Sequence, residues 1–208
     1  MVNRVKAVLF RKSTSALLVL AATAIASGAM IVSASTTINQ IGSDIDGEAA
    51  GDYSGFSVSL SSDGTAVAIG AHLNDGNGAD SGHVRVYEWN ENAWQQKGAD
   101  INGEAEGDRS GVSVSLSSDG TVVAIGAIRN DGNGSDAGHV RVYEWNENAW
   151  QQKGADIDGE AEGDYSGFSV SLSSDGTVVA VGAQRNGAYS GHVRVYEWNE
   201  NAWQQKGA

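Results

Sequence analysis

The chain has 208 residues, with 28 glycines, no proline, no cysteine and a formal net charge of −13 at pH 7. The absence of cysteine excludes disulfides and thiolate metal sites, and the acidity disfavours nucleic acid as a partner because like charges repel. Two interpretations of the acidity stand: it keeps a strand-rich protein soluble, or it attracts cations and basic protein surfaces.

Residues 1–34 have the pattern of an export signal. Four basic and no acidic residues lie in the first 12 positions, and residues 16–34 are uncharged and mostly apolar over nearly the length of a membrane span. The stretch ends in Val32-Ser33-Ala34, whose small residues suit a signal peptidase. We expect a hydrophobic helix, as a cleaved signal peptide or an uncleaved anchor. Either places the rest of the chain outside the cytosol, secreted or at the cell surface, with membrane contact only through an uncleaved segment.

Residues 35–208 consist of three copies of one unit, at about 38–98, 99–154 and 155–208. The third copy is three residues shorter than the second, and the deletion falls in one segment, which marks that segment as an exposed loop. Self-similarity with a period of about fifty residues is typical of propeller repeats. The most regular motif, GHVRVYEWNENAWQQKGA, begins at Gly82, Gly138 and Gly191.

Each unit predicts four short strands, which in the first unit are residues 56–60, 65–71, 83–89 and 93–97. The first strand alternates apolar and small polar residues, and Asp63-Gly64 supplies a tight turn before the second. The second strand carries apolar or small residues on both faces. A sheet with two apolar faces needs a neighbour on each side, which favours stacked propeller blades over a sandwich.

The expected fold is therefore all-β, with three four-stranded antiparallel blades of the β-propeller type after the N-terminal hydrophobic helix. Closed propellers have about four to eight blades, so three blades form an incomplete ring. A fragment, a truncated gene product, and a protomer that completes its ring by self-association all fit this count. Residues 38–42 resemble one further fourth strand without a blade of its own.

The units resemble the FG-GAP repeats of integrin-alpha-like propellers, in the bacterial and algal variant, over about residues 38–208. Gly55-Phe56 and Gly167-Phe168 stand near the Phe-Gly element of that family. The Gly-Ala of its Gly-Ala-Pro is matched at Gly70-Ala71, Gly126-Ala127 and Gly182-Ala183. The resemblance implies a propeller with a binding or adhesive role. The family's calcium hairpin corresponds here to Ser61–Thr65, which has one carboxylate where calcium takes six to eight oxygens.

Most of the 26 acidic residues fall in the connections between units and in the loops between strands two and three. In an up-and-down meander these two sets of loops lie on the same rim. Two of the loops alternate oxygen-bearing side chains, as hard cations such as Ca²⁺ prefer, which gives the candidate metal ligands Asp75, Asn77, Asp80, Asp131, Asn133 and Asp136. The alternative is a solvated acidic turn without an ion, and the third unit lacks the pattern.

A few positions beside this rim break the threefold repetition, including those where the family has its proline. We expect any specificity for a partner to lie in these residues: His72, Leu73, Ile128, Arg129, Gln184, Arg185 and Tyr189. Six tryptophans occur as three pairs, which form either an aromatic platform for sugars or cross-strand packing. The repeated histidines, His83, His139 and His192, fit a structural contact with a nearby acid better than catalysis.

Nearly every polar residue is triplicated, whereas an active site needs one asymmetric constellation. We therefore expect no catalytic and no cofactor-binding residues, with Ca²⁺ as the one cofactor considered. The favoured function is a non-enzymatic extracellular or cell-surface binding or adhesion module for a protein or glycan ligand. A structural array or propeller fragment without a specific ligand is the alternative, and a hydrolase propeller ranks last.

Overall fold

The computed structural model describes residues 38–207. The predicted export segment, with its hydrophobic helix, lies outside these residues. The blades all belong to one compact unit that begins at Gly42. Within residues 38–207, no helix has both the length and the apolar character needed to cross a bilayer.

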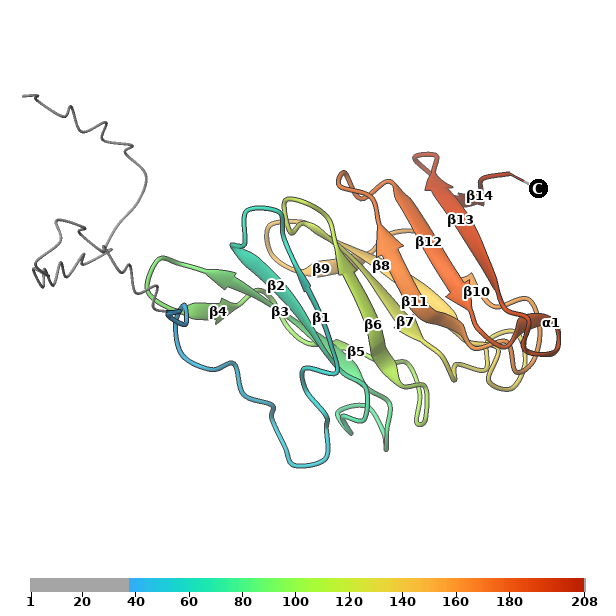
Figure 1. The fold of residues 1–208 in the computed structure, drawn as a ribbon, viewed down its shortest axis with the longest axis horizontal. Helices are drawn as coiled ribbons and strands as arrows, with labels where there is room; N and C mark the ends of the chain where they lie inside the picture. The colour runs from blue at the N-terminus through green and yellow to red at the C-terminus, as the bar shows by residue number, and fades with distance from the viewer. Residues whose placement is uncertain (1–37, 208) are drawn as a thin grey trace, which may run out of the picture. The chain divides into compact units, whose positions relative to one another are not determined.

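Three antiparallel sheets follow one another along the chain, and each is a meander of four main strands (Figure 1). The first sheet contains β1 (Ser57–Leu60), β2 (Ala66–Ala71), β3 (His83–Trp89) and β4 (Trp94–Gln96). The second contains β6 (Ser110–Leu116), β7 (Val122–Ala127), β8 (His139–Trp145) and β9 (Trp150–Gln152). The third contains β11 (Ser166–Leu172), β12 (Val178–Ala183), β13 (His192–Trp198) and β14 (Trp203–Gln205). The predicted all-β fold of blade-like sheets is confirmed.

Two further strands, β5 (Ile101–Asn102) and β10 (Ile157–Asp158), lie in segments that were expected to be connections between blades. Each pairs with the beginning of the third strand of its sheet, β3 or β8, whereas β4 and β9 pair with its end. The fourth strand of these two blades is therefore interrupted and resumes after four residues. Ile101 and Ile157, at the start of the resumed part, are buried.

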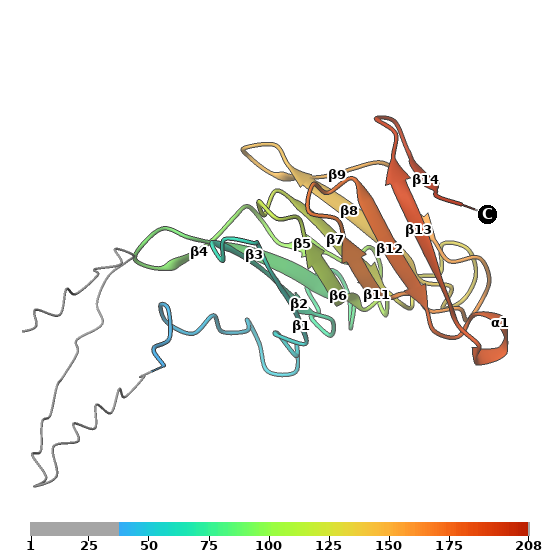
Figure 2. The same cartoon turned by 45° about the horizontal axis from the view of Figure 1, so that its top comes forward.

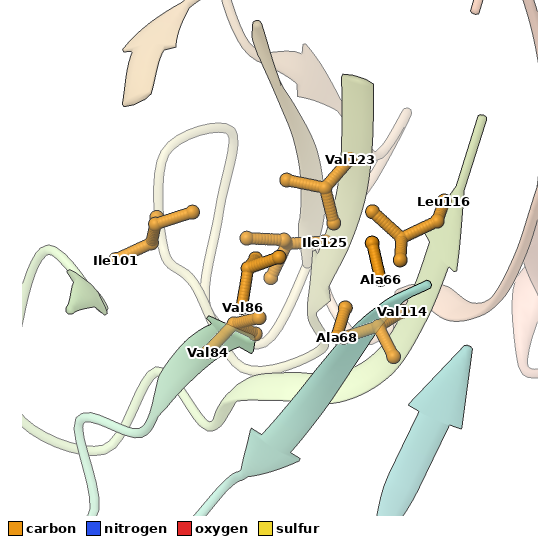
Figure 3. Close-up of a cluster of buried hydrophobic side chains, with 9 residues drawn as sticks. All are labelled: Ala66, Ala68, Val84, Val86, Ile101, Val114, Leu116, Val123 and Ile125. Carbon is orange, nitrogen blue, oxygen red and sulfur yellow. The ribbon is translucent and has the colours of Figure 1, made fainter. Parts of the chain in front are cut away.

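Apolar side chains fill the space between neighbouring sheets. Figure 3 shows the first of these layers, where Ala66, Ala68, Val84 and Val86 of the first blade meet Val114, Leu116, Val123 and Ile125 of the second. One repeat later, Val122, Ala124, Val140 and Val142 meet Val179, Val181 and Tyr196 of the third blade. The middle sheet therefore buries both of its faces against its neighbours, as two apolar faces on one strand require.

The serines of the first strand in a blade form hydrogen bonds to the next blade. Ser57 Oγ donates to the carbonyl oxygen of Gly111 at 2.8 Å, and Ser59 Oγ accepts from the backbone N–H of Leu116 at 2.9 Å. Ser113 and Ser115 repeat both contacts with the third blade. The alternation along the first strand therefore sorts its side chains between two neighbours. Its apolar residues face the preceding blade, and its serines face the following one.

The three sheets do not close into a ring within residues 38–207 (Figure 2). On the outer side of the first blade, Val58 and Leu60 are 63% and 61% exposed. On the outer side of the third blade Val193 is 66% exposed, although its equivalents Val84 and Val140 are fully buried between blades. Both outer sides therefore present apolar residues that a neighbouring blade would cover.

Residues 38–42 form no strand, contrary to the expectation of an extra fourth strand. In each blade the fourth strand pairs with the third strand. No third strand precedes residues 38–42 among the described residues, so these residues have no strand to pair with. Gly42 nevertheless packs against the rings of Trp89 and Trp94, as Gly98 packs against the corresponding pair of the second blade. Gly42 therefore occupies the place that the end of a fourth strand would occupy, but residues 38–42 make no strand pairing.

Candidate functional site

The loops between strands two and three lie against the connections between blades, as the meander predicts. Asn77 Nδ2 donates to the carbonyl oxygens of Gly103 and Glu104 at 2.8 and 3.0 Å. The backbone N–H of Gly107 donates to the carbonyl of Ala79 at 2.9 Å. The two sets of acidic loops thus form a single rim, called the acidic rim below.

Part of the acidity of this rim serves the fold. Asp108 is 4% exposed, and its Oδ2 accepts from the backbone N–H of Ala105 at 3.0 Å and from Asn130 Nδ2 at 3.1 Å. Asp52 and Asp164 are buried in the same way and bond the corresponding asparagines. Because these carboxylates are already paired, only the exposed acids of the rim are accessible to a ligand.

The candidate calcium ligands form local turns. The carboxylate of Asp75 accepts from the backbone N–H of Asp80 at 2.9 Å, and Asp131 does the same for Asp136 at 2.8 Å. The side-chain nitrogens of Asn77 and Asn133 donate to the carbonyls of Gly103 and Gly159 at 2.8 Å each. These contacts fit the ion-free turn, and calcium binding here stays a prediction.

The hairpin between β1 and β2, where the family resemblance implies calcium, is closed by one carboxylate. Asp63 Oδ1 accepts from Ser61 Oγ at 2.7 Å, from Thr65 Oγ1 at 2.8 Å and from the backbone N–H of Thr65 at 3.0 Å. These hydrogen bonds, led by the one from the Thr65 backbone, lower the pKa of Asp63 to about 2. These side-chain and backbone hydrogen bonds close the turn around Asp63.

The structure divides the predicted partner-binding residues by burial. His72 and Ile128 are 8% and 7% exposed, so neither presents its side chain to a partner. The ring of His72 lies 4.1 Å from that of Phe56, and Ile128 packs with Val112 and Tyr165. Both positions directly follow the second strand of their blade, as does the exposed Gln184 in the third blade. Leu73 and Arg129 are half-buried, and Gln184, Arg185 and Tyr189 are exposed.

The exposed residues gather at the third blade, where the shortened loop contains the helical turn α1 (Asn186–Tyr189). Ala188 and Tyr189 have left-handed backbone conformations, with φ of 59° and 70°, which cost energy in residues other than glycine. Tyr189 is 76% exposed. The guanidinium of Arg185 lies 3.9 Å from the ring centroid of Tyr165 and 5.7 Å from that of Tyr189. The exposed Arg185 and Tyr189, together with the buried ring of Tyr165 under the guanidinium, therefore form an asymmetric site, called the Tyr–Arg patch below.

The tryptophan pairs pack across strands, as the structural interpretation predicts. Trp89 and Trp94 are paired in register, with ring centroids 5.4 Å apart, and the other two pairs repeat this geometry. Trp150 Nε1 donates to the carbonyl of Lys97 at 2.7 Å, and Trp203 Nε1 donates to that of Lys153 at 2.7 Å. The second tryptophan of a pair thus holds the end of the preceding blade.

Each repeated histidine lies beside an acid from a connection between blades, as expected. His83 Nδ1 is 3.8 Å from Glu48 Oε2, and His192 Nδ1 is 3.5 Å from Glu160 Oε2. His139 Nδ1 approaches two acids, Glu104 Oε2 at 3.9 Å and Asp156 Oδ2 at 3.6 Å. Burial, and after it the nearby Arg141, lower the pKa of His139 to about 4, so the imidazole is neutral at pH 7. The strand pattern did not reveal which acids would meet these histidines, because their connections lie far away in sequence.

Comparison with known proteins agrees with the blade architecture. The FG-GAP repeat model matches residues 43–87 and 102–143. No curated protein matches the chain. A solved structure from Bacteroides uniformis, which carries the provisional name 6-phosphogluconolactonase, is 13% identical with a TM-score of 0.50, over 72% of this chain and 38% of that one.

Hydrazine synthase from Kuenenia stuttgartiensis is 12% identical with a TM-score of 0.49, over 80% of this chain and 38% of that one. The chain thus spans less than two fifths of the length of these solved structures. At such identities the likeness to the Bacteroides structure concerns the fold alone. The matched segments lie in the first two blades, whose sheets have the expected four main strands, and we conclude that residues 43–87 and 102–143 are FG-GAP repeats.

Proposed function

We propose that this chain is a non-enzymatic binding or adhesion module that acts outside the cytosol, as a secreted or cell-surface protein, and recognises a protein or glycan. The proposal rests on where the repeat symmetry fails. Scaffold contacts such as the aspartate–asparagine bonds of the rim recur in all three blades. The Tyr–Arg patch has no copy in the first two blades, and its Arg185 and Tyr189 are exposed.

The composition of the Tyr–Arg patch fits recognition. Tyrosine and arginine are enriched in binding hot spots because they combine a large apolar surface with hydrogen-bonding groups. Arg185 stacked on Tyr165 is partly ordered before binding, which reduces the entropy that a partner must remove. The strained backbone at Tyr189 supports the same reading, since strain is retained mainly where surrounding contacts or function require it.

A glycan array and a panel of immobilised extracellular proteins test the proposal. We expect the full chain to bind one class of ligand and Arg185→Ala or Tyr189→Ala to weaken that binding at least tenfold. Gln204→Ala, an exposed change on β14, is the matched control and leaves binding unchanged. Binding that is equally strong in all variants, or no binding to any probe, would contradict the proposal.

The second candidate is a structural array in which copies of the chain stack end to end. It is favoured by the two outer sides. The equivalents of Val193 are fully buried between blades, and those of Leu60, which are Leu116 and Leu172, are buried and partly buried there. A second copy would then repeat the contact already present between the second and third blades. Sedimentation velocity at increasing concentration distinguishes the two candidates. Stacking predicts oligomers that the Val193→Asp variant no longer forms. A chain that is monomeric at all concentrations would contradict the structural array.

A further inference from the structure

The first two blades each place a buried histidine between two carboxylates. In the first blade the group consists of Glu48, His83 and Asp100, and one ligand atom from each lies within 4.8 Å of the other two. Glu104, His139 and Asp156 form the same group one repeat later, within the same limit. In each group the glutamate precedes the blade, the histidine begins its third strand and the aspartate follows its fourth strand.

The histidine in each group is unusual for its burial and its lack of partners. The side chains of His83 and His139 are 1% exposed. Neither ring nitrogen of either residue makes a hydrogen bond to another described residue, although buried polar groups are normally bonded. In both, Nδ1 is directed toward the glutamate Oε2, at 3.8 Å for Glu48 and 3.9 Å for Glu104. An unpaired buried donor or acceptor lowers stability, so a group bound at the centre of the cluster would relieve this penalty.

The charges around each cluster favour a cation. Burial and the carboxylates of Asp156, Asp108 and Asp158 raise the pKa of Glu104, whereas Arg141 lowers it. Glu104 Oε2 also accepts a long hydrogen bond of 3.5 Å from Asn130 Nδ2. The guanidinium of Arg141 does not lie between the histidine and the glutamate. Arg141 Nη1 contacts Oε1 of Glu104 at 3.5 Å, whereas the other carboxylate oxygen, Oε2, faces the histidine. In the first cluster, Arg85 likewise contacts Oε1 of Glu48, and Oε2 faces His83.

We propose that each of these two clusters binds one divalent transition-metal ion of the zinc type, through the histidine Nδ1, the glutamate Oε2 and one aspartate oxygen. A tetrahedral site with metal–ligand bonds of about 2.1 Å has ligand atoms about 3.4 Å apart. The observed 3.6 Å and 3.9 Å around His139 need to shorten by about 0.2 and 0.5 Å, and the glutamate and aspartate oxygens, which lie within 4.8 Å of each other, also need to close to this separation. A water completes the fourth position. A neutral imidazole suits zinc, copper, iron or nickel, whereas calcium prefers oxygen ligands alone.

The arginine would support the site without contacting the metal ion itself. By contacting the glutamate oxygen that does not face the metal, Arg85 or Arg141 would fix the orientation of that carboxylate. The bound ion would join the third strand of a blade to the connections before and after it. The third blade provides an internal comparison: Glu160 and His192 lie 3.5 Å apart, but within residues 38–207 no aspartate completes their group.

Isothermal titration of the untagged, metal-free full chain with ZnCl₂ at pH 7.5 tests the proposal. We expect binding of two equivalents, and Co²⁺ in place of Zn²⁺ is expected to give the intense visible absorption of a tetrahedral site. His83→Asn and His139→Asn are each expected to lose one equivalent, and the double variant both. His192→Asn is the matched control and retains two equivalents, because no aspartate among residues 38–207 completes the group of His192 and Glu160.

Folding of the variants is checked by circular dichroism. Should the histidine variants fail to fold, Asp100→Asn and Asp156→Asn change partly exposed ligands while the buried histidines remain, and each is expected to lose one equivalent. The proposal is overturned if zinc does not bind, if the folded double variants bind the same number of equivalents as the unaltered chain, or if excess Ca²⁺ displaces the bound Zn²⁺. This result is independent of the ligand-binding proposal, because the Tyr–Arg patch is unchanged in every variant.

Discussion

Ser113 Oγ in the second blade donates a hydrogen bond of 2.7 Å to the carbonyl oxygen of Gly167 in the third blade, 54 residues further along the chain. Gly126 lies beside Ser113 in register on the next strand. A Cβ atom on Gly126 would collide with the same carbonyl oxygen. The absent side chain of Gly126 therefore lets the backbone of the third blade approach closely enough for the serine to reach it. This explains in physical terms the glycine of the repeated Gly-Ala motif.

Replacing Gly126 by alanine is expected to lower the free energy of unfolding by about 2–3 kcal/mol, because the new methyl group forces two backbones apart. Gly182→Ala is the matched control. The position is equivalent, but the atom nearest to its Cβ is the rotatable hydroxyl of Ser169, and among residues 38–207 no backbone of another blade lies against it. We expect a change within about 0.5 kcal/mol there. Urea denaturation of both variants measures the difference, and equal losses would contradict the close approach.

The buried aspartates of the rim make a second prediction. Asp108→Ala would leave the Asn130 amide and the Ala105 N–H without their shared acceptor, which is expected to cost about 2–3 kcal/mol of unfolding free energy. Glu106→Ala, an exposed change in the same connection, is expected to alter it by less than about 0.5 kcal/mol. A comparable loss in both would mean that the acidity of the rim, and not the specific bonds, stabilises the loops.

The turn residue Asp63 gives a pH dependence. Its folded pKa of about 2 lies below the ordinary 3.8, so its contribution to stability is fully present above pH 4 and is lost as the pH falls through 2. Carboxyl-detected NMR titration is expected to place its midpoint near 2. In a Ser61→Ala, Thr65→Val double variant, which removes two of its donors, the midpoint is expected to move up toward 3.8. A midpoint that does not move would show that these hydroxyls do not hold the carboxylate.

The period of the repeats and the alternation of their residues were enough to predict the strands, the blade stacking and the single acidic rim. The resumed fourth strand was missed, because two residues such as Ile101-Asn102 are too short to show an alternating pattern. The inward direction of His72 and Ile128 was missed because it depends on how a loop leaves its strand. The histidine–carboxylate groups were missed as metal sites, because Glu48, His83 and Asp100 belong to three segments joined only by the sheet.

The central claim is that neighbouring repeats bury their broad faces against each other, and methyl NOE spectroscopy of the full chain tests it most directly. Methyl contacts are expected between Val84 or Val86 and Ile125, and between Val142 and Val181, which lie in successive blades. Contacts confined to methyl groups within one repeat would contradict the stacked blades, and with them the rim and the clusters built on that stacking.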